Sequence, residues 1–239
     1  MAKTKRKGML PVNNAQKTLH KNLEFTATEQ YKLLRTNLSF TLSDESKCHI
    51  IGVTSSMRGE GKSTTSINLA YVLAESGKRV MLIDGDLRIP SIAKKMNIDG
   101  SFGLTDLLRG GETIELGKFQ TTIMPNWYVI PSGPLPPNPS ELLGSKRMES
   151  TLNQLKEYYD YIVIDLPPVN LVSDALAISK YISGMIVVIR EDYAEKRELE
   201  TCMRQLKLSN VNVLGCVMNE SGGFNKTGSY KRSYRRPYK

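Results

Sequence analysis

The segment CHIIGVTSSMRGEGKSTT, residues 48–65, decides the fold because it joins an apolar run to a helical pattern through a glycine loop. The run 48–54 predicts a buried strand. The loop that follows contains Gly59 and Gly61, and the helical pattern continues until Gly77 stops it. A strand, a loop and a helix in this order form the first half of a strand–helix–strand unit, so we expect an α/β fold.

The rest of the chain repeats this alternation. Five further apolar runs predict strands, at 79–86, 127–133, 161–168, 184–192 and 211–219. Helical patterns lie at 26–42, 140–159, 174–182 and 195–208. In the first of these, Thr26 and Glu29 have the spacing of a capping box, and Leu33, Leu34 and Leu38 form an apolar stripe. Strands this uniformly apolar are covered on both faces. We therefore expect a doubly wound, mostly parallel β-sheet flanked by helices.

The charge divides the chain into three segments. We expect a flexible basic N-terminal segment 1–22, a folded domain 23–222 and a disordered basic Tyr-rich tail 223–239. Four Lys or Arg residues lie within the first seven residues and six lie in the tail, with no acid in either. Ten positive charges against a net charge of +9 leave the body near neutral. Basic ends either contact an anionic partner, such as a membrane surface, or simply add solubility. A near-neutral body does not favour nucleic acid as a partner.

Cysteine usage and hydropathy favour a cytoplasmic protein. Cys48, Cys202 and Cys216 are an odd number with no paired spacing, and each lies in or beside an apolar segment, so we expect buried, reduced thiols. No apolar run approaches the roughly 18 residues that a membrane span needs. The basic N-terminus lacks the apolar region of a signal peptide.

The glycine loop has the composition of a phosphate-binding loop. It matches G-x-x-x-x-G-K-[ST] except at the first position, Ser56, which fits only if its backbone angle is ordinary for an L-residue. Lys62 would reach the β- and γ-phosphates, and the Ser63 hydroxyl would bind Mg²⁺. The alternative is a strand-to-helix turn with a surface lysine. The predicted nucleotide-binding residues are Gly59, Glu60, Gly61, Lys62, Ser63 and Thr64.

Three acids end two of the predicted strands. Asp84 and Asp86 end VMLIDGD, and Asp165 ends YIVID. The carboxyl ends of parallel strands line the ligand crevice of such a sheet, where three carboxylates need a cation. Mg²⁺ bound to ATP supplies it, with Ser63, Asp84 and Asp165 as the expected ligands. The alternative for each Asp is a helix N-cap. Asn219, at the end of the last strand, is either an adenine contact or a plain turn residue.

These motifs together resemble the bacterial tyrosine kinases (BY-kinases), specifically the soluble capsule and exopolysaccharide type. The resemblance covers roughly residues 26–239. GEGKST corresponds to the Walker A motif, LIDGDLR to Walker A′ and VIDLPP to Walker B, and SGPLPPNPSELL and the C-terminal tyrosines also match. The resemblance implies the P-loop NTPase fold, the cofactors ATP and Mg²⁺, and control of polysaccharide biosynthesis. It also implies a ring-shaped homo-oligomer, a membrane-bound activator with a cytoplasmic tail, an opposing tyrosine phosphatase, and recruitment to the inner face of the plasma membrane.

Two positions depart from the family pattern. Leu166 follows the Walker B Asp, where the family usually has a small polar residue. The family's interface motif, Glu-x-x-Arg-x-x-Arg, is here Glu29, Lys32 and Arg35. Residues three apart share a helix face, but Lys lacks the planar fork of Arg, which weakens a bidentate contact. The alternative is a solvated stripe of intrahelical ion pairs.

Tyr230, Tyr234 and Tyr238 repeat every four residues in the basic tail. Weak membrane anchors or a helix face are alternatives, but we expect phosphoryl acceptors that enter a neighbouring subunit's site. Positioning and charge neutralisation dominate phosphoryl transfer. The expected catalytic residues are Lys62, Asp84, Asp86 and Asp165. Either Asp84 or Asp86 would accept the phenol proton.

Two other functions fit part of this pattern. A MinD/ParA-like spatial-organising ATPase shares the fold, but Met57 and Arg58 occupy the place of the signature lysine of that group. A non-catalytic nucleotide-binding scaffold would keep the glycine loop and would not need all three acids.

Overall fold

The protein forms an α/β fold built on a parallel sheet, as the sequence predicts. The computed structural model describes residues 23, 25–42, 46–110, 116–119, 121 and 123–220 of the 239-residue chain. Within these ranges six strands form one sheet in the order β3-β2-β4-β1-β5-β6, and every pair is parallel. The strands are β1 (His49–Ser55), β2 (Val80–Asp84), β3 (Trp127–Ile130), β4 (Tyr161–Asp165), β5 (Gly184–Arg190) and β6 (Val213–Asn219).

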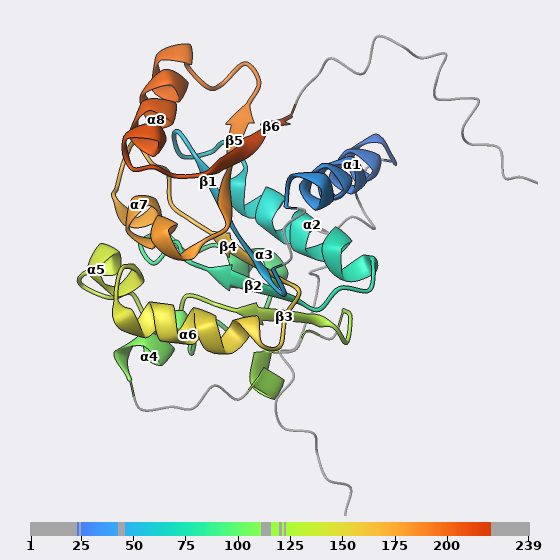
Figure 1. Ribbon diagram of the computed structural model, residues 1–239, viewed down its shortest axis with the longest axis vertical. Helices are drawn as coiled ribbons and strands as arrows, with labels where there is room; N and C mark the ends of the chain where they lie inside the picture. Colours follow the sequence, from blue (N-terminus) through green and yellow to red (C-terminus); the bar gives the residue numbers. More distant parts are fainter. Residues whose placement is uncertain are drawn as a thin grey trace, which may run out of the picture.

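Helices cover both faces of the sheet (Figure 1). One face is covered by α1 (Phe25–Thr41), α2 (Lys62–Glu75) and α3 (Ile92–Met96). The other is covered by α4 (Leu104–Arg109), α5 (Pro139–Leu143), α6 (Lys146–Lys156), α7 (Asp174–Ile178) and α8 (Lys196–Leu208). Two short 3₁₀ turns lie at Leu116–Phe119 and Ser179–Tyr181. Strands β1 to β5 point alternate side chains into the two cores, which explains their continuous apolar sequences.

Helix α2 is the most enclosed of the helices because it packs between the sheet and α1. Helix α2 ends where the sequence predicts. Ser76 is its C-cap, and Gly77 takes a left-handed conformation with φ 87°. The first residue of α2 is Lys62, so the glycine loop leads directly into the helix N-terminus. The sheet and α1 together hold that N-terminus at the carboxyl edge of β1.

Three predictions about the helices differ from the structure. Helix α1 begins at Phe25, so Thr26 lies inside it and does not cap it. Leu33 is 51% exposed, because Tyr31, Leu34 and Leu38 form the face that packs on the core. The predicted helix 140–159 is two helices, separated by residues 144–145. There the Ser145 hydroxyl caps α6 by accepting a hydrogen bond from the Met148 amide.

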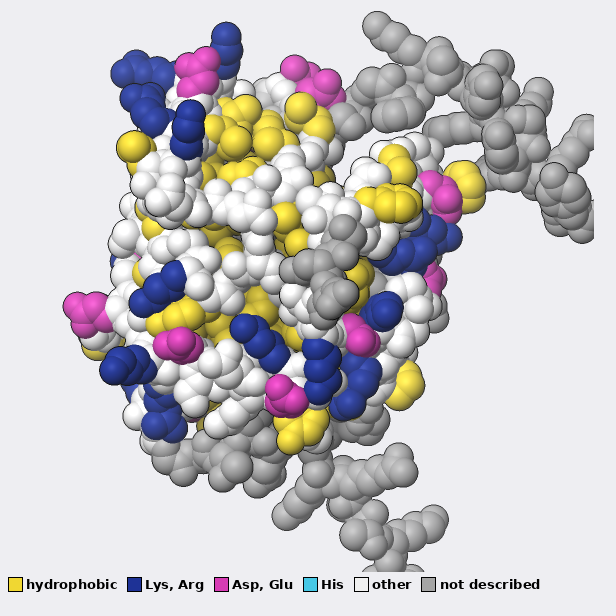
Figure 2. Space-filling model, in the orientation of Figure 1, with side chains coloured by type: hydrophobic (Ala, Val, Ile, Leu, Met, Phe, Trp, Pro, Cys, Tyr) yellow, Lys and Arg dark blue, Asp and Glu magenta, His cyan; other side chains and the backbone are white. Residues whose placement is uncertain are grey.

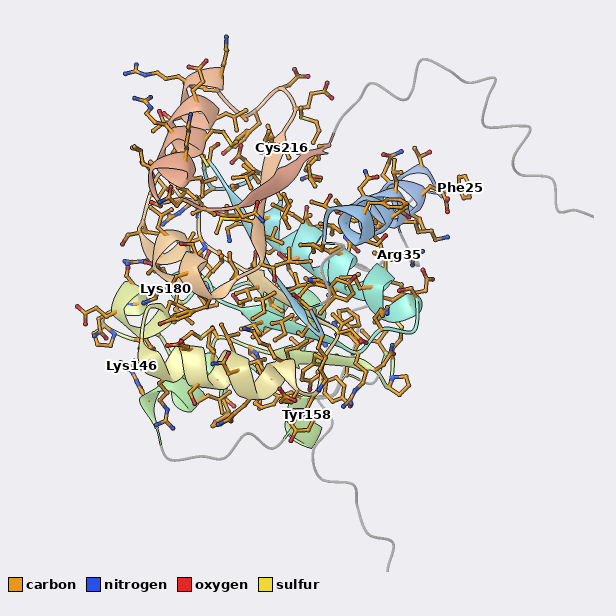
Figure 3. The ribbon with its side chains drawn as sticks, in the orientation of Figure 1. Phe25, Arg35, Lys146, Tyr158, Lys180 and Cys216 are labelled. Carbon is orange, nitrogen blue, oxygen red and sulfur yellow. The ribbon has the colours of Figure 1, made fainter. Side chains whose placement is uncertain are left out.

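The cysteine prediction was right for two residues of three. Cys48 and Cys202 are buried and reduced, but Cys216 is exposed on β6, one of the two edge strands (Figure 3). All residues of β6 are half-buried or exposed, whereas β3 at the opposite edge of the sheet is almost entirely buried. In the described part of the chain, no helix is long and apolar enough to cross a membrane.

Candidate active site

The phosphate loop, residues 56–63, connects β1 to α2 and is shaped by its glycines. Gly59 and Gly61 have φ of 84° and 97°, left-handed values that side-chain-bearing residues rarely adopt. Ser56 is not among the residues with positive φ, so serine is compatible with the first position of the motif. The loop therefore places glycine where its backbone requires it and leads into a helix N-terminus, which favours anions.

The side chain of Glu60 stabilises the phosphate loop from inside. Its buried carboxylate accepts hydrogen bonds from the Ser56 hydroxyl at 3.0 Å and from the Met57 amide at 2.7 Å. The carboxylate is thus committed to the loop itself. Any contact of Glu60 with a nucleotide is left to its backbone.

The acids and the lysine named from the sequence lie together at the carboxyl edge of the sheet. Strand register makes Asp84 of β2 and Asp165 of β4 direct neighbours. The Lys62 ammonium lies 2.8 Å from Asp86 and 3.9 Å from Asp165. Ser66, one turn further along α2, donates to Asp165 at 3.1 Å. All three carboxylates are buried.

The helix-cap alternative also holds for part of this cluster. One oxygen of Asp84 accepts hydrogen bonds from the amides of Ser91 and Ile92, at 3.1 and 2.9 Å, where α3 begins. Asp86 accepts one from the Ile89 amide at 3.0 Å. These bonds fix both side chains of the turn after β2. They leave the second oxygen of Asp84 without a hydrogen-bond donor.

Burial and mutual repulsion raise the pKa values of the neighbouring acids. Burial, followed by the charge of Asp165, raises the pKa of Asp84 to about 7. Burial also raises the pKa of Asp165, against the lowering effects of Lys62 and the Ser63 hydroxyl. Burial disfavours the Lys62 ammonium, but Asp165, Asp86 and Asp84 together outweigh it, so the pKa of Lys62 lies above its usual value. The single positive charge of Lys62 does not neutralise three carboxylates, so a further cation would be attracted to the cluster.

A divalent cation fits this arrangement. Asp84 Oδ1 and Asp165 Oδ2 are buried and have no hydrogen-bond donor, and they belong to neighbouring strands. Among the described residues, no group of three or more His, Cys, Asp or Glu is arranged as a complete metal site. Mg²⁺ usually takes only one or two carboxylates, as this pair would supply, and completes its shell with water and phosphate oxygens.

A second ionic contact ties the loops around the site together, and sequence reasoning missed it. Arg88 donates two hydrogen bonds to the buried Asp174, at 2.9 and 3.0 Å. Ser140 also donates to Asp174 and lies 3.1 Å from Ser173. The loops after β2, β3 and β4 are therefore fastened to one another. The only sequence signal was the arginine that follows GDL in the Walker A′ segment.

The remaining predicted residues lie apart from this cluster. Thr64 accepts a hydrogen bond from Lys95 at 3.2 Å. Glu29 and Lys32 form an ion pair on α1 at 2.9 Å, and Arg35 donates to the Val72 carbonyl of α2 at 2.8 Å (Figure 3). The acceptor candidates Tyr230, Tyr234 and Tyr238 lie outside the described residues.

Comparison with known proteins first defines the class. The family model described as an AAA domain matches residues 48–213. Tyrosine-protein kinase CpsD of Streptococcus pneumoniae serotype 4 is 38% identical over 203 residues, which are 84% of this chain and 88% of CpsD. Tyrosine-protein kinase ptk of Acinetobacter johnsonii is 36% identical over 200 residues, 84% of this chain, but the chain spans only 27% of ptk.

Solved structures agree with these relatives. The crystal structure of the chimerical protein CapA2B2 has a TM-score of 0.78 and 30% identity, with 88% of this chain and 92% of that chain covered. The kinase domain of Escherichia coli tyrosine kinase ETK has a TM-score of 0.77 and 30% identity, with 92% and 82% covered. The chain therefore belongs to the family of bacterial tyrosine kinases. This confirms the resemblance and does not favour the spatial-organising ATPase.

The pKa of Asp84 predicts how replacing this residue changes stability with pH. In the unfolded chain an Asp titrates near pH ~4, whereas buried Asp84 titrates at about 7. The folded protein thus holds an extra proton between these values, and its free energy of unfolding falls as pH rises through this window. Asp84→Asn removes this titration. Without metal, the free energy of unfolding of the variant, relative to that of the wild type, should therefore rise by roughly 2 kcal/mol from pH 5 to pH 8.

Urea denaturation in EDTA at pH 5, 6, 7 and 8 measures this difference. Asp99→Asn is the matched control, because Asp99 is exposed and a hydrogen bond from the Ser101 amide lowers its pKa. Its curve should run parallel to the wild type over this range. Parallel curves for Asp84→Asn as well would contradict the assignment.

Proposed function

We propose that this chain is an ATP-dependent protein-tyrosine kinase that phosphorylates Tyr230, Tyr234 and Tyr238 of a second copy. One observation supports this above the others. Lys62, Asp84, Asp86 and Asp165 come from three separate segments and meet beside the phosphate loop at the carboxyl edge of the sheet. This is where open α/β sheets bind their ligands.

Each residue has a distinct role in this proposal. Asp84 and Asp165 each have a carboxylate oxygen that accepts no hydrogen bond, and these oxygens would bind Mg²⁺ together with Ser63. Lys62 moves from Asp86 to the β- and γ-phosphates, and its raised pKa keeps it charged while it does so. When bound, ATP would supply the phosphoryl group and Mg²⁺ would neutralise its negative charge. The hydrogen bonds of Glu60 within the phosphate loop, and those of Asp84 with the start of α3, keep Lys62 and the acids in position.

Asp86 is the proposed proton acceptor. Of the three acids it follows β2 by two residues, so it lies beyond the neighbouring pair of Asp84 and Asp165. A tyrosine phenol has a pKa of about 10 and is a poor nucleophile near neutral pH. As the phenol oxygen bonds to the γ-phosphorus of ATP, the bond from that phosphorus to the bridging oxygen breaks and ADP leaves, while the phenol proton passes to a carboxylate oxygen of Asp86. Departure of Lys62 from Asp86 frees that oxygen.

Transfer in trans requires subunits to meet, and α1 is the proposed contact within a ring. Glu29 and Lys32 are partly exposed, and Leu33 and Phe40 are 51% and 75% exposed. Figure 2 shows hydrophobic and charged side chains together over this helix. An exposed mixture of this kind is typical of subunit interfaces. Arg35 already holds the Val72 carbonyl, so Glu29 and Lys32 are the motif residues most available to a neighbour.

The proposed cellular role is control of capsular or exopolysaccharide biosynthesis at the inner face of the plasma membrane. The family and the named kinases CpsD and ETK support the kinase activity. The resemblance to the family implies an activator whose cytoplasmic tail joins the nucleotide site. An opposing tyrosine phosphatase would reset the tail. These partners rest on the family resemblance.

Mixing two variants tests transfer in trans. Lys62→Met keeps the tyrosines and loses the phosphate-loop cation. A second chain with Tyr230, Tyr234 and Tyr238 replaced by Phe keeps the catalytic groups. With Mg²⁺ and ATP, mass spectrometry should find phosphotyrosine on the tail of the Lys62→Met chain only in the mixture, at a level at least 100-fold above that chain alone, because removing charge stabilisation costs several kcal/mol.

The same mixture tests the proposed interface. Glu29→Ala in both chains should lower the transfer several-fold and leave each subunit's stability nearly unchanged, since an exposed ion pair contributes about 0–1 kcal/mol. Lys47→Ala, which breaks the exposed Lys47–Glu157 pair elsewhere, is the matched control. Phosphotyrosine on Lys62→Met alone refutes the role of Lys62, and transfer unaffected by Glu29→Ala refutes the α1 interface.

Phosphorylation should also change the attraction of the tail to an anionic membrane. Each phosphotyrosine adds about −1.5 to −2 charges, so three nearly cancel the six positive charges of residues 223–239. Each basic residue near an anionic leaflet contributes at most ~1 kcal/mol. Co-sedimentation with phosphatidylserine vesicles should therefore fall at least tenfold after Mg²⁺ and ATP treatment. Equal binding in both states excludes this switch.

A further inference from the structure

Asp174 is a buried carboxylate to which the proposed reaction gives no role. It is the first residue of α7, and its side chain is fully buried. Two N–H groups of Arg88 donate to its two oxygens at 2.9 and 3.0 Å, and the Ser140 hydroxyl donates to it as well. A two-point contact of this kind fixes the orientation of a guanidinium as well as its position. The loops that meet here follow β2, β3 and β4, which are neighbours in the sheet.

The segment SGPLPPNPSELL, residues 132–143, is held at both ends, and one of the two anchors is Asp174. Just before the segment, the Pro131 carbonyl accepts a hydrogen bond from the Leu104 amide at the start of α4, at 2.8 Å. Near its other end, Ser140 contacts Asp174, and α5 lies beside α7 (Figure 1). Loss of the Asp174 contact would therefore leave this segment held at one end only.

Arg88 belongs to the same turn as Asp86, the proposed proton acceptor. The Ile89 amide donates to one oxygen of Asp86 at 3.0 Å, and the Lys62 ammonium lies 2.8 Å from the other. Arg88 stands between the two ends of the Asp86–Ile89 hydrogen bond, and its own side chain is held by Asp174. The contact with Asp174 therefore fixes the backbone on which the orientation of Asp86 depends.

Asp174 also determines which carboxylate neutralises Arg88. The hydrogen bond to Asp174 raises the pKa of Arg88 against the effect of burial, and the charges of Asp174 and Asp86 add to the increase. The guanidinium is thus near enough to Asp86 to be attracted by it. In the proposed reaction Lys62 leaves Asp86. If Asp174 did not hold Arg88, the guanidinium would be free to pair with Asp86 in place of the lysine.

We propose that Asp174 is a positioning residue for the turn after β2. By holding the Arg88 guanidinium, it fixes the turn that carries Asp86 and keeps a positive charge away from the Asp86 carboxylate during transfer. Through Ser140 it also fixes residues 132–143 beside that turn. The proposal rests on the proposed function for the role of Asp86, whereas the fastening of the two loops does not depend on that function.

The transfer assay between two chains tests this role. Asp174→Asn is placed in the catalytic chain, whose tail tyrosines are replaced by Phe, and the Lys62→Met chain is the acceptor. The kcat should fall about 10- to 100-fold, because a small displacement of a catalytic group has an effect of this size. The KM for Mg²⁺·ATP should change less than twofold, since the phosphate loop is intact. A raised KM with an unchanged kcat overturns the proposal.

The matched control is Arg147→Lys, which changes another arginine on the same face of the sheet. Arg147 lies on α6 and donates a hydrogen bond to the Leu107 carbonyl of α4 at 2.9 Å. This variant should keep the kcat of the wild type. An equal loss of kcat in Arg147→Lys and Asp174→Asn overturns the proposal, because any loosened loop contact would then have the same effect.

A second substitution separates positioning from a merely structural role. Arg88→Met removes the guanidinium that Asp174→Asn releases, so the double variant should transfer at least threefold faster than Asp174→Asn. The Arg88 side chain is 39% exposed, so its unpaired charge is solvated and its removal should change the thermal stability little. A double variant no faster than Asp174→Asn overturns the separation of charges. A rescue that only follows a gain in thermal stability overturns it too.

Hydrogen exchange tests the fastening of the loops without phosphoryl transfer. In Asp174→Asn, peptides that cover residues 84–92 and 132–143 should exchange at least threefold faster than in the wild type, because both segments lose an anchor. Peptides from α2 should exchange as in the wild type. Unchanged exchange in both segments overturns the positioning role. Failure of the proposed function shows separately, as phosphotyrosine absent from the wild type.

Discussion

The buried cluster of Lys62 with Asp84, Asp86 and Asp165 is the constraint on which the rest of the site depends. Three carboxylates in a low-dielectric edge of the sheet repel one another, and burial raises the pKa of Asp84 to about 7. One ammonium group relieves only part of this repulsion. A bound cation would therefore relieve the remaining repulsion. Without it, the repulsion lowers the stability of the fold at its functional site.

The fold holds this cluster in place through features that no single segment contains. Register between β2 and β4 sets Asp84 beside Asp165. The phosphate loop brings in Lys62 and is supported from inside by Glu60 and from outside by Asn219. The Arg88–Asp174 pair fastens the surrounding loops. The sheet and the hydrogen-bonded loops thus fix the positions of these groups. Phosphoryl transfer relies on such positioning.

The sequence predicted the strands and the convergence of the acids well, because both follow from local patterns and from the parallel direction of the strands. It did not predict contacts between distant loops. Arg88 and Asp174 are far apart along the chain, as are Glu60 and Asn219, and their residue types alone indicate no pairing. Leu33 was assigned to the buried stripe because it is apolar and adjacent to Leu34. Of the three leucines, only Leu34 and Leu38, four residues apart, lie on the buried face. Cys216 looked buried because an edge strand has the same composition as a central one.

The most direct test of this account is the effect of Mg²⁺ on ADP affinity in the wild type and in Asp165→Asn. Isothermal titration calorimetry, with Mg²⁺ and with EDTA, gives the ratio of the two affinities for each protein. We predict that Mg²⁺ tightens ADP binding at least several-fold in the wild type, and that Asp165→Asn loses most of this gain and still binds ADP in EDTA. An equal gain from Mg²⁺ in both proteins would contradict the role of the buried acids.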